Sequence, residues 1–380
     1  MLNQDIYKDI RPYLPAEVPL AVARIMENPQ FQLALDYLYS KEEHAAMIAA
    51  TRSVKSGFEF QKVFMYPAIK KVLKLSSQGL ALSGVDFLKN NGPSVLLSNH
   101  RDILLDSAIL QTVLVDQDME TSEITFGSNL MINDFIIDFG KINRMYKVHR
   151  EGAPRELLRH AQHLSAYINH TIKDKKVSSW IAQRKGRTKN GWDKTDTGVL
   201  KMLTVFDRKK PFQAYKAINI LPVAISYEWE PCDLQKVREL YLSEKQTYVK
   251  KADEDFKAVI NGIINPKGHI KMAFGKPLNQ FLEENKSIVS LNNIHQEVAR
   301  FIDEQVSQNY QLYPNNYAAY DMLFDSQEYS AYYKVSSKEE LENKLQQLYQ
   351  LVGEENAQLK QMFLKLYANP ILQKKHFSFM

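Results

Sequence analysis

The first 76 residues carry a helical pattern of apolar and polar positions. In the segment FQLALDYLYSKEEHAAMIAATRSVKSGFEFQKVFMYPAIKKVLKL, apolar side chains recur at spacings of three and four. This is the period of an amphipathic helix. Pro67 marks a helix start, because the first helical turn needs no amide hydrogen from its residues. The sequence therefore predicts a helical N-terminal region over residues 1–76.

From residue 77 the pattern changes to short apolar runs separated by helix-like segments. The runs of strand length are LALSGV, SVLLSN, ITFGS, MYKVH, VSSWIAQ and INILPVAISYEW. Helices are expected between them, over residues 102–115, 131–142 and 154–174. Alternating strands and helices predict an α/β fold with a mixed central sheet flanked by helices, over residues 77–300.

Helical periodicity returns after residue 235. The segment VRELYLSEKQTYVKKADEDF has a helical pattern, and HIKMAFGKPL is predicted to be an edge strand. Residues 301–380 are predicted as a C-terminal helical region, interrupted by the tyrosine-rich YQLYPNNYAAYDMLF. The rings of these tyrosines are expected to pack with their hydroxyl groups near the surface, because each ring is apolar and its tip is polar.

Composition excludes several classes of protein. Cys232 is the one cysteine, so the chain has no internal disulfide and no thiolate metal site. The N-terminal twenty residues lack the basic start, apolar run and cleavage site of a secretion signal, which gives the expectation of a cytoplasmic protein. No apolar run approaches the roughly 18 residues of a membrane-spanning helix. A net charge of +5 favours anionic partners.

One histidine stands where a predicted strand meets a predicted helix. In SVLLSNHRDILLDSAILQTVL the strand passes through Ser98 and Asn99 to His100 before the helix starts. Ligands of open α/β sheets bind at the carboxyl ends of strands, so His100 is well placed for chemistry. His100 and Asp106 would be about 240° apart on one continuous helix. They can therefore meet only if His100 lies in the turn before the helix.

Asp102 is a second acidic residue in this segment. Asp102 and Asp106 lie four apart on one helix face, and they repel each other unless a cation such as His100 or Arg101 lies between them. A carboxylate that holds a histidine fixes the ring tautomer and stabilises the imidazolium, which makes the histidine a general base. The ordinary interpretation, a surface or helix-capping histidine, stays open on spacing alone.

The segment NHRDILLD resembles the His-x4-Asp motif of the glycerolipid acyltransferases, the superfamily of the glycerol-3-phosphate and 1-acylglycerol-3-phosphate acyltransferases. This chain has five residues between His100 and Asp106, where the motif has four. The resemblance implies that His100 is the catalytic base and that Asp106 is its partner, with Asp102 as the alternative partner. It also implies an α/β acyltransferase that uses no metal and no cofactor besides its thioester co-substrate.

Three further blocks of that superfamily have counterparts here, in the expected order. FGKINRMYKVHR ends at Arg150 and resembles a strand whose terminal arginine contacts a phosphate of the acceptor. WIAQRKGRTKNG resembles the block usually written Phe-Pro-Glu-Gly-Thr-Arg. INILPVAIS, with Pro222, resembles a fourth block, a strand entered by a proline. Together the similarity spans about residues 80–230.

The third block is also a basic loop by its own composition. Gly186 lets backbone amides approach a ligand, and the guanidinium groups beside it suit bidentate contacts to phosphate. A solvated surface loop is the alternative. The loop departs from the family motif, since Lys185 stands in the place of the glutamate, and Arg187 and Thr188 replace Thr-Arg. The predicted substrate-binding residues are Arg150, Arg184, Lys185, Gly186 and Arg187.

The resemblance implies an enzyme of phospholipid biosynthesis. It would move a fatty acyl group from coenzyme A or acyl carrier protein to the hydroxyl of a glycerol phosphate, a lysolipid or a non-phosphorylated acceptor such as a lipoamino acid. A peripheral position at the inner membrane face is expected, because such products are lipids. Lys185 favours one alternative, a degenerate member of the same fold that binds a lipid or an anion without turnover. No nucleic-acid partner is expected, since 49 basic residues nearly balance 44 acidic ones.

Overall fold

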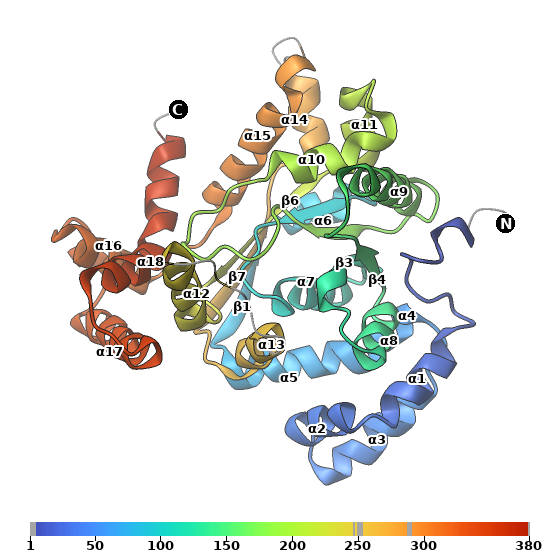
Figure 1. Ribbon diagram of the computed structural model, residues 1–380, viewed down its shortest axis with the longest axis horizontal. Coiled ribbons are helices and arrows are strands. Elements are labelled where there is room, and N and C mark those ends of the chain that lie inside the picture. Colours follow the sequence, from blue (N-terminus) through green and yellow to red (C-terminus); the bar gives the residue numbers. More distant parts are fainter. Residues whose placement is uncertain (1–4, 246–247, 249–253, 287–290, 379–380) are drawn as a thin grey trace.

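A seven-stranded sheet forms the centre of the molecule (Figure 1). The computed structural model describes residues 5–245, 248, 254–286 and 291–378. The strand order is β1-β7-β6-β2-β5-β3-β4, and β6 and β7 are antiparallel whereas the other neighbours are parallel. The predicted α/β fold with a mixed central sheet is confirmed. The strands are β1 (Gly79–Ser83), β2 (Val95–Ser98), β3 (Glu123–Gly127), β4 (Met145–Val148), β5 (Ser179–Ala182), β6 (Leu221–Tyr227) and β7 (His269–Phe274).

The prediction that β7 is an edge strand is wrong. It pairs with β1 in parallel on one side and with β6 in antiparallel on the other. In the first half of β7, His269 is exposed and Lys271 is half-buried, but the last three residues of the strand are buried. Because β1 pairs alongside β7, the edges of the sheet are β1 and β4.

Helices cover both faces of the sheet (Figure 1). One core contains Ile168, Leu200 and Ile302, and the other contains Ile69 and Ile109. Three of the helices lie where the sequence predicts them, and two of those begin three residues later than expected. The helices between β1 and β6 are α6 (Val85–Asn90), α7 (Leu105–Asp116), α8 (Asp134–Ile142), α9 (Pro154–Lys173), α10 (Thr197–Thr204) and α11 (Pro211–Ile218).

The N-terminal region is helical, as predicted. Pro67 lies in the first turn of α5, and a π-helical turn at Gln61–Met65 precedes this helix. Phe60 and Phe64 are buried in a small core that the first helices share with α8. The helices are α1 (Val18–Met26), α2 (Pro29–Leu38), α3 (Lys41–Arg52), α4 (Gly57–Phe60) and α5 (Tyr66–Ser76).

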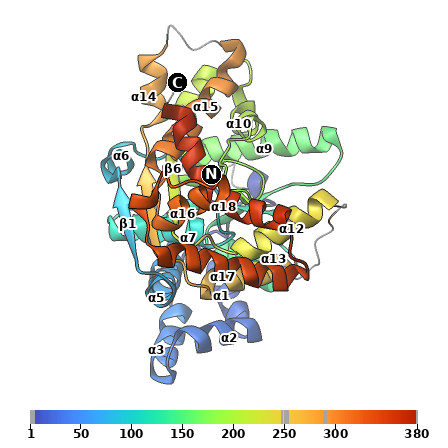
Figure 2. The same cartoon turned by 90° about the vertical axis from the view of Figure 1, so that its left-hand side faces the viewer.

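The remaining helices follow β6. The structure does not describe all of the residues between α12 and α13. The helical pattern predicted over this segment is therefore tested only at its two ends, which form parts of α12 and α13. Helices α16 to α18 lie together on one side of the molecule (Figure 2). The helices are α12 (Asp233–Lys245), α13 (Glu254–Ile264), α14 (Leu278–Glu284), α15 (Ile294–Asn309), α16 (Pro314–Phe324), α17 (Val335–Val352) and α18 (Ala357–Ser378). Single 3₁₀ turns lie at Asp5–Tyr7, Ser128–Leu130, Val205–Asp207, Leu291–Asn293 and Ser330–Tyr332.

The tyrosine-rich segment interrupts the helical region only at residues 310–313, between α15 and α16, and the rest of it forms helix α16. Pro314 occupies the first turn, and the Asn316 side chain accepts a hydrogen bond from the amide of Tyr313, which caps the helix start. The rings are less exposed than expected, since Tyr313 and Tyr320 are buried. The division of the chain into three regions stays a prediction. No helix in the described ranges is long and apolar enough to cross a bilayer.

Gly84 is a position where the backbone requires glycine. Its φ is +69°, and a Cβ atom there would overlap the carbonyl oxygen of Phe274. We expect Gly84→Ala to lower the free energy of unfolding by about 3 kcal/mol, because the variant combines backbone strain with a clash against rigid main chain. Urea unfolding measures this loss. Gly92→Ala is the matched control: its φ is also +69°, but nothing lies within 4 Å of a Cβ there, so only roughly 1 kcal/mol of strain applies. Equal losses in the two variants would contradict the clash.

Candidate active site

His100 lies in the loop between β2 and α7, at the carboxyl end of a central strand. Its Nδ1 atom lies 2.9 Å from Oδ2 of Asp106, which is in the first turn of α7. The ring also packs edge-on against Trp180, with 5.8 Å between the ring centroids. The His100 side chain is 12% exposed and that of Asp106 is 0% exposed. The structure thus brings together the two residues that the sequence analysis paired.

Asp106 is surrounded by hydrogen-bond donors. Besides His100, its Oδ2 accepts the backbone N–H of Arg101 at 2.6 Å and that of Asp102 at 2.9 Å. Its Oδ1 accepts the hydroxyl of Tyr227 at 2.9 Å. The helix N-terminus and these donors stabilise a negative carboxylate. Because an ionised carboxylate only accepts, Nδ1 of His100 carries the hydrogen, and Nε2 is the ring nitrogen without one.

Asp102 has a different role from Asp106. Its Oδ1 accepts the amides of Leu104 and Leu105 at 2.9 and 2.8 Å, which caps the start of α7. Its Oδ2 is buried and has no hydrogen-bond partner within the described ranges. Burial, and next the charge of Asp106, raise the pKa of Asp102. The carboxylate that holds the imidazole ring is therefore that of Asp106.

The basic loop after β5 has one buried arginine and an exposed lysine. Arg187 is 8% exposed, and its Nη1 atom has no hydrogen-bond partner among the residues described. The charge of Arg187 opposes the burial-driven rise of the Asp102 pKa. Lys185 is exposed and Arg184 is half-buried. Gly186 has φ +77° and open space around it, so it serves the turn conformation.

Arg150 follows the carboxyl end of β4. Its guanidinium lies over Gly127 at the end of β3, where a Cβ atom would be 2.8 Å from Nε. Burial lowers the pKa of Arg150, and the charge of Asp255 on α13 acts in the opposite direction. His100, Arg187 and Arg150 all follow parallel strands, so they lie along one edge of the sheet. In the strand order, β5 and β3 separate Arg150 from His100.

A narrow, mostly apolar pocket lies beside this histidine–aspartate pair. Helix α7 forms one wall, and α5 with its preceding π-helical turn forms the opposite wall. Leu104 and Ser107, which are close to Asp106 in sequence, are among its lining residues. The sequence analysis missed this pocket, because its walls come from segments far apart in the chain. It is lined by Gln61, Met65, Tyr66, Ile69, Leu104, Ser107, Ala108, Gln111, Thr112, Ile124, Asn143 and Met145.

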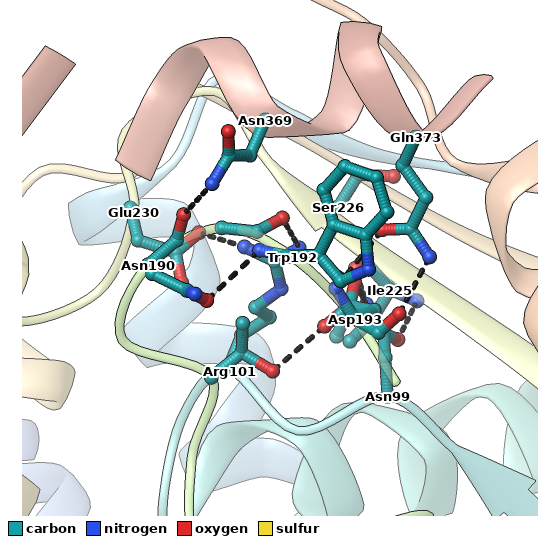
Figure 3. A network of polar contacts seen from close by, with 12 residues as sticks. Asn99, Arg101, Asn190, Trp192, Asp193, Ile225, Ser226, Glu230, Asn369 and Gln373 are labelled. Atoms are coloured by element: carbon teal, nitrogen blue, oxygen red, sulfur yellow. Dashed lines mark hydrogen bonds and ion pairs between the residues drawn. The ribbon is translucent and has the colours of Figure 1, made fainter. Parts of the chain in front are cut away.

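Figure 3 shows a buried polar network next to the His100 loop. Arg101 is 1% exposed, and its guanidinium contacts Asp193 at 2.6 Å and Glu230 at 3.3 Å. Its side chain therefore does not lie between the two acids of the loop, as the sequence analysis had allowed. Tyr227 and Asp193 were also missed. One feature of the sequence could have indicated Tyr227. It is the last residue of β6, which runs parallel to β2, so it lies at the same carboxyl edge of the sheet as His100.

No family model and no curated protein matches this chain. Among solved structures, the chain is similar to the crystal structure of the 1-acyl-sn-glycerophosphate (LPA) acyltransferase PlsC from Thermotoga maritima. The sequence identity is 13%, the match covers 77% of this chain and 94% of that chain, and the TM-score is 0.39. The chemistry of the site therefore rests on this chain's own side chains.

Asp303 of α15 anchors the loop that carries Arg187. Its Oδ1 accepts the amide and the hydroxyl of Thr195 at 2.7 and 2.6 Å. Burial raises the pKa of Asp303 to about 6. In an unfolded chain the pKa of an aspartate is about 3.9, so the folded state binds the proton more tightly, and stability is lost as the pH rises from about 4 through 6.

We expect Asp303→Asn to be more stable than the wild type at pH 7.5 by up to about 2 kcal/mol, and equally stable near pH 4. The amide keeps an oxygen acceptor for Thr195 without the buried charge. Urea unfolding over this pH range measures the difference. Glu304→Gln, whose side chain makes an exposed hydrogen bond to Gln308 on the same helix, is the control. A less stable Asp303→Asn at pH 7.5 would show that the charge itself is needed.

Proposed function

We propose that this chain is an O-acyltransferase of phospholipid biosynthesis. It moves a fatty acyl group from an acyl thioester, coenzyme A or acyl carrier protein, to the hydroxyl of a glycerol-phosphate-type or related lipid acceptor. One observation carries the proposal: a partly exposed imidazole at the carboxyl edge of the sheet, with Nδ1 of His100 held 2.9 Å from the buried carboxylate of Asp106. This is the arrangement of a general base.

The reaction is a direct transfer. Nε2 of His100 removes the proton of the acceptor hydroxyl while its oxygen attacks the thioester carbonyl carbon. An oxygen–carbon bond forms, and the carbon–sulfur bond then breaks. The imidazolium returns the proton to the leaving thiolate, so the base is regenerated. Between these two proton transfers, Asp106 stabilises the imidazolium through its hydrogen bond to Nδ1. No covalent acyl-enzyme is needed.

Arg187 supports an anionic group on the acceptor. A buried donor without a partner costs about 1–3 kcal/mol, and a phosphate oxygen at Nη1 of Arg187 would remove that cost. Arg184, Lys185 and the backbone at Gly186 lie on the same loop, where they would contribute further contacts. Arg150, along the same edge, is a further arginine assigned to the acceptor.

The pocket beside α7 is the apolar opening assigned to the acyl chain. Its wall is mostly apolar, which suits methylene groups, and Leu104 and Ser107 in that wall are close to Asp106 in sequence. Its volume of about 20 Å³ holds little more than one water molecule, so an acyl chain enters only when α5 and α7 separate. The amide side chains in its wall already have hydrogen-bond partners: Gln111 bonds Ser107 and Ser122, and Gln61 bonds Thr121 and the Asn143 carbonyl oxygen. Because the product of the transfer is a lipid, we assign the protein to a peripheral, cytoplasmic position at a membrane surface.

The second candidate function is a lipid- or anion-binding protein that has lost turnover. The observation that favours it is Lys185, a base in the place of the family's glutamate, exposed on the loop. Acceptor binding without transfer, in every pairing of donor and acceptor, would support this candidate.

We expect His100→Ala to lower kcat by about 10³-fold or more with an unchanged circular dichroism spectrum, because the base is lost. The assay pairs acyl-coenzyme A and acyl carrier protein donors with glycerol 3-phosphate, lysophosphatidate and a lipoamino acid. Asp106→Asn should lower kcat by about 10²-fold or more, whereas Asp102→Asn, its matched control, should change kcat by less than about threefold. Wild-type turnover in His100→Ala would refute the base, and a larger loss in Asp102→Asn would reassign the partner.

Arg187→Ala should raise the KM for a phosphorylated acceptor by about tenfold or more and leave the KM for the donor unchanged, since one charge-assisted contact is lost. Lys185→Ala, an exposed position on the same loop, is the control and should have a smaller effect. Steady-state kinetics with each substrate varied in turn separates the two constants. Equal weakening of both substrates would place Arg187 at the donor instead.

A further inference from the structure

The loop between β5 and α10 carries a buried carboxylate that the proposed reaction does not use. Asp193 is 2% exposed and lies at the centre of the network in Figure 3. A buried charge is expensive unless several partners surround it. Its partners are therefore the best guide to its role.

The carboxylate of Asp193 binds three residues around His100. Its Oδ2 accepts hydrogen bonds from Nδ2 of Asn99 at 2.9 Å and from Nη2 of Arg101 at 2.6 Å. Its Oδ1 accepts the hydroxyl of Thr188 at 2.7 Å. Asn99 and Arg101 are the chain neighbours of His100, and the amide of Thr188 donates to the His100 carbonyl oxygen at 2.8 Å. One side chain thus fixes the His100 backbone on both sides.

The same contacts reach the carboxylate that holds the ring. The backbone N–H of Arg101 donates to Asp106, so anchoring the guanidinium also fixes an amide that bonds this carboxylate. Asn99 is bonded to both backbone groups of Ile225 in β6. Two residues later, this strand ends at Tyr227, which donates to Asp106 from the other side. The relative position of His100 and Asp106 depends on these links.

Helix α18 fixes Asp193 in turn. The amide of Asp193 donates to Oε1 of Gln373 at 2.9 Å, and Nε2 of Gln373 donates to the Asp193 carbonyl oxygen at 2.5 Å. Gln373 is 3% exposed, so water does not compete for these bonds. A residue 180 positions away in sequence therefore holds the loop in place.

The charges in this network balance. Arg101 pairs with Asp193 and Glu230, and Glu230 also pairs with Lys236 at 2.6 Å. All four side chains are at most 3% exposed. Removing one charge leaves a buried partner uncompensated, so the network strongly favours one arrangement.

We propose that Asp193 is a positioning residue for the acyl transfer, and that Gln373 of α18 holds it in place. Through Asn99, Arg101 and Thr188, Asp193 sets the backbone of His100 so that the ring meets Asp106. The kinetic part of this inference rests on the proposed function. Its geometric part does not, because the hydrogen bond between His100 and Asp106 can be observed without any substrate.

The test is Asp193→Asn in the full chain. We expect kcat to fall by about 10- to 100-fold and both KM values to stay within about twofold, because a small displacement of the base slows the chemistry more than binding. The proton NMR signal of the His100 Nδ1 hydrogen should shift or disappear. Asn369→Ala is the matched control: this half-buried side chain of α18 donates to the Asn190 carbonyl oxygen of the same loop at 2.7 Å. It should leave kcat and the signal unchanged.

A second variant is needed because Asp193→Asn removes a charge partner of Arg101 and puts the folding of the protein at risk. Gln373→Leu keeps all four buried charges and removes only the two hydrogen bonds between Gln373 and the Asp193 backbone. We expect kcat to fall by about 3- to 10-fold, with a change in the same NMR signal. Folded variants with a lower melting temperature but an unchanged kcat and signal would overturn the proposal. If the wild type transfers no acyl group, the proposed function fails, and the NMR signal alone decides the role of Asp193.

Discussion

The hydrogen bond between His100 and Asp106 is the interaction on which this edge of the sheet depends. A fully buried carboxylate is tolerated only where donors replace the lost water, and Asp106 has four: an imidazole, two consecutive amides and a tyrosine hydroxyl. The two amides come from the loop itself, so the loop must wrap around the carboxylate. That requirement fixes the path of the chain between β2 and α7.

Asp106 and Asp102 both follow His100 closely in sequence, but their carboxyl groups lie in different environments. Asp106 is saturated with donors. One oxygen of Asp102 is satisfied, the other has no hydrogen-bond partner in the part of the chain that the structure describes, and the pKa of this side chain is raised. The chain thus separates two tasks within one short loop: one carboxyl orients the ring and the other starts the helix. A close approach of α13, at Gly262, covers the second carboxyl, and a side chain at that position would overlap it.

The sequence predicted the local part of this structure well and the long-range part poorly. The strands and helices follow from runs and periodicity. The pairing of His100 with Asp106 lies within one strand–turn–helix unit, but it was the resemblance that favoured Asp106 over Asp102. Tyr227, Asp193 and the pocket walls come from segments far from His100 in sequence, and periodicity does not tell which of them meet. For the same reason β7 was placed at an edge. The basic loop shows a further limit, since neighbouring residues of like charge, Lys185 and Arg187, have opposite burial.

The π-helical turn at Gln61–Met65 has a consequence for how this protein could diversify. Such a turn arises when a helix gains one residue, and it pushes side chains out of the regular helical period. Here Gln61 and Met65 reach the wall of the apolar pocket from this turn. Deleting a single residue would return the segment to ordinary α-helix and withdraw part of that wall, without altering any residue of the His100 loop. The α5-side wall of the pocket and the His100–Asp106 pair are therefore encoded in separate stretches of the gene, and an insertion or deletion in the first stretch can change the pocket while the pair is inherited intact.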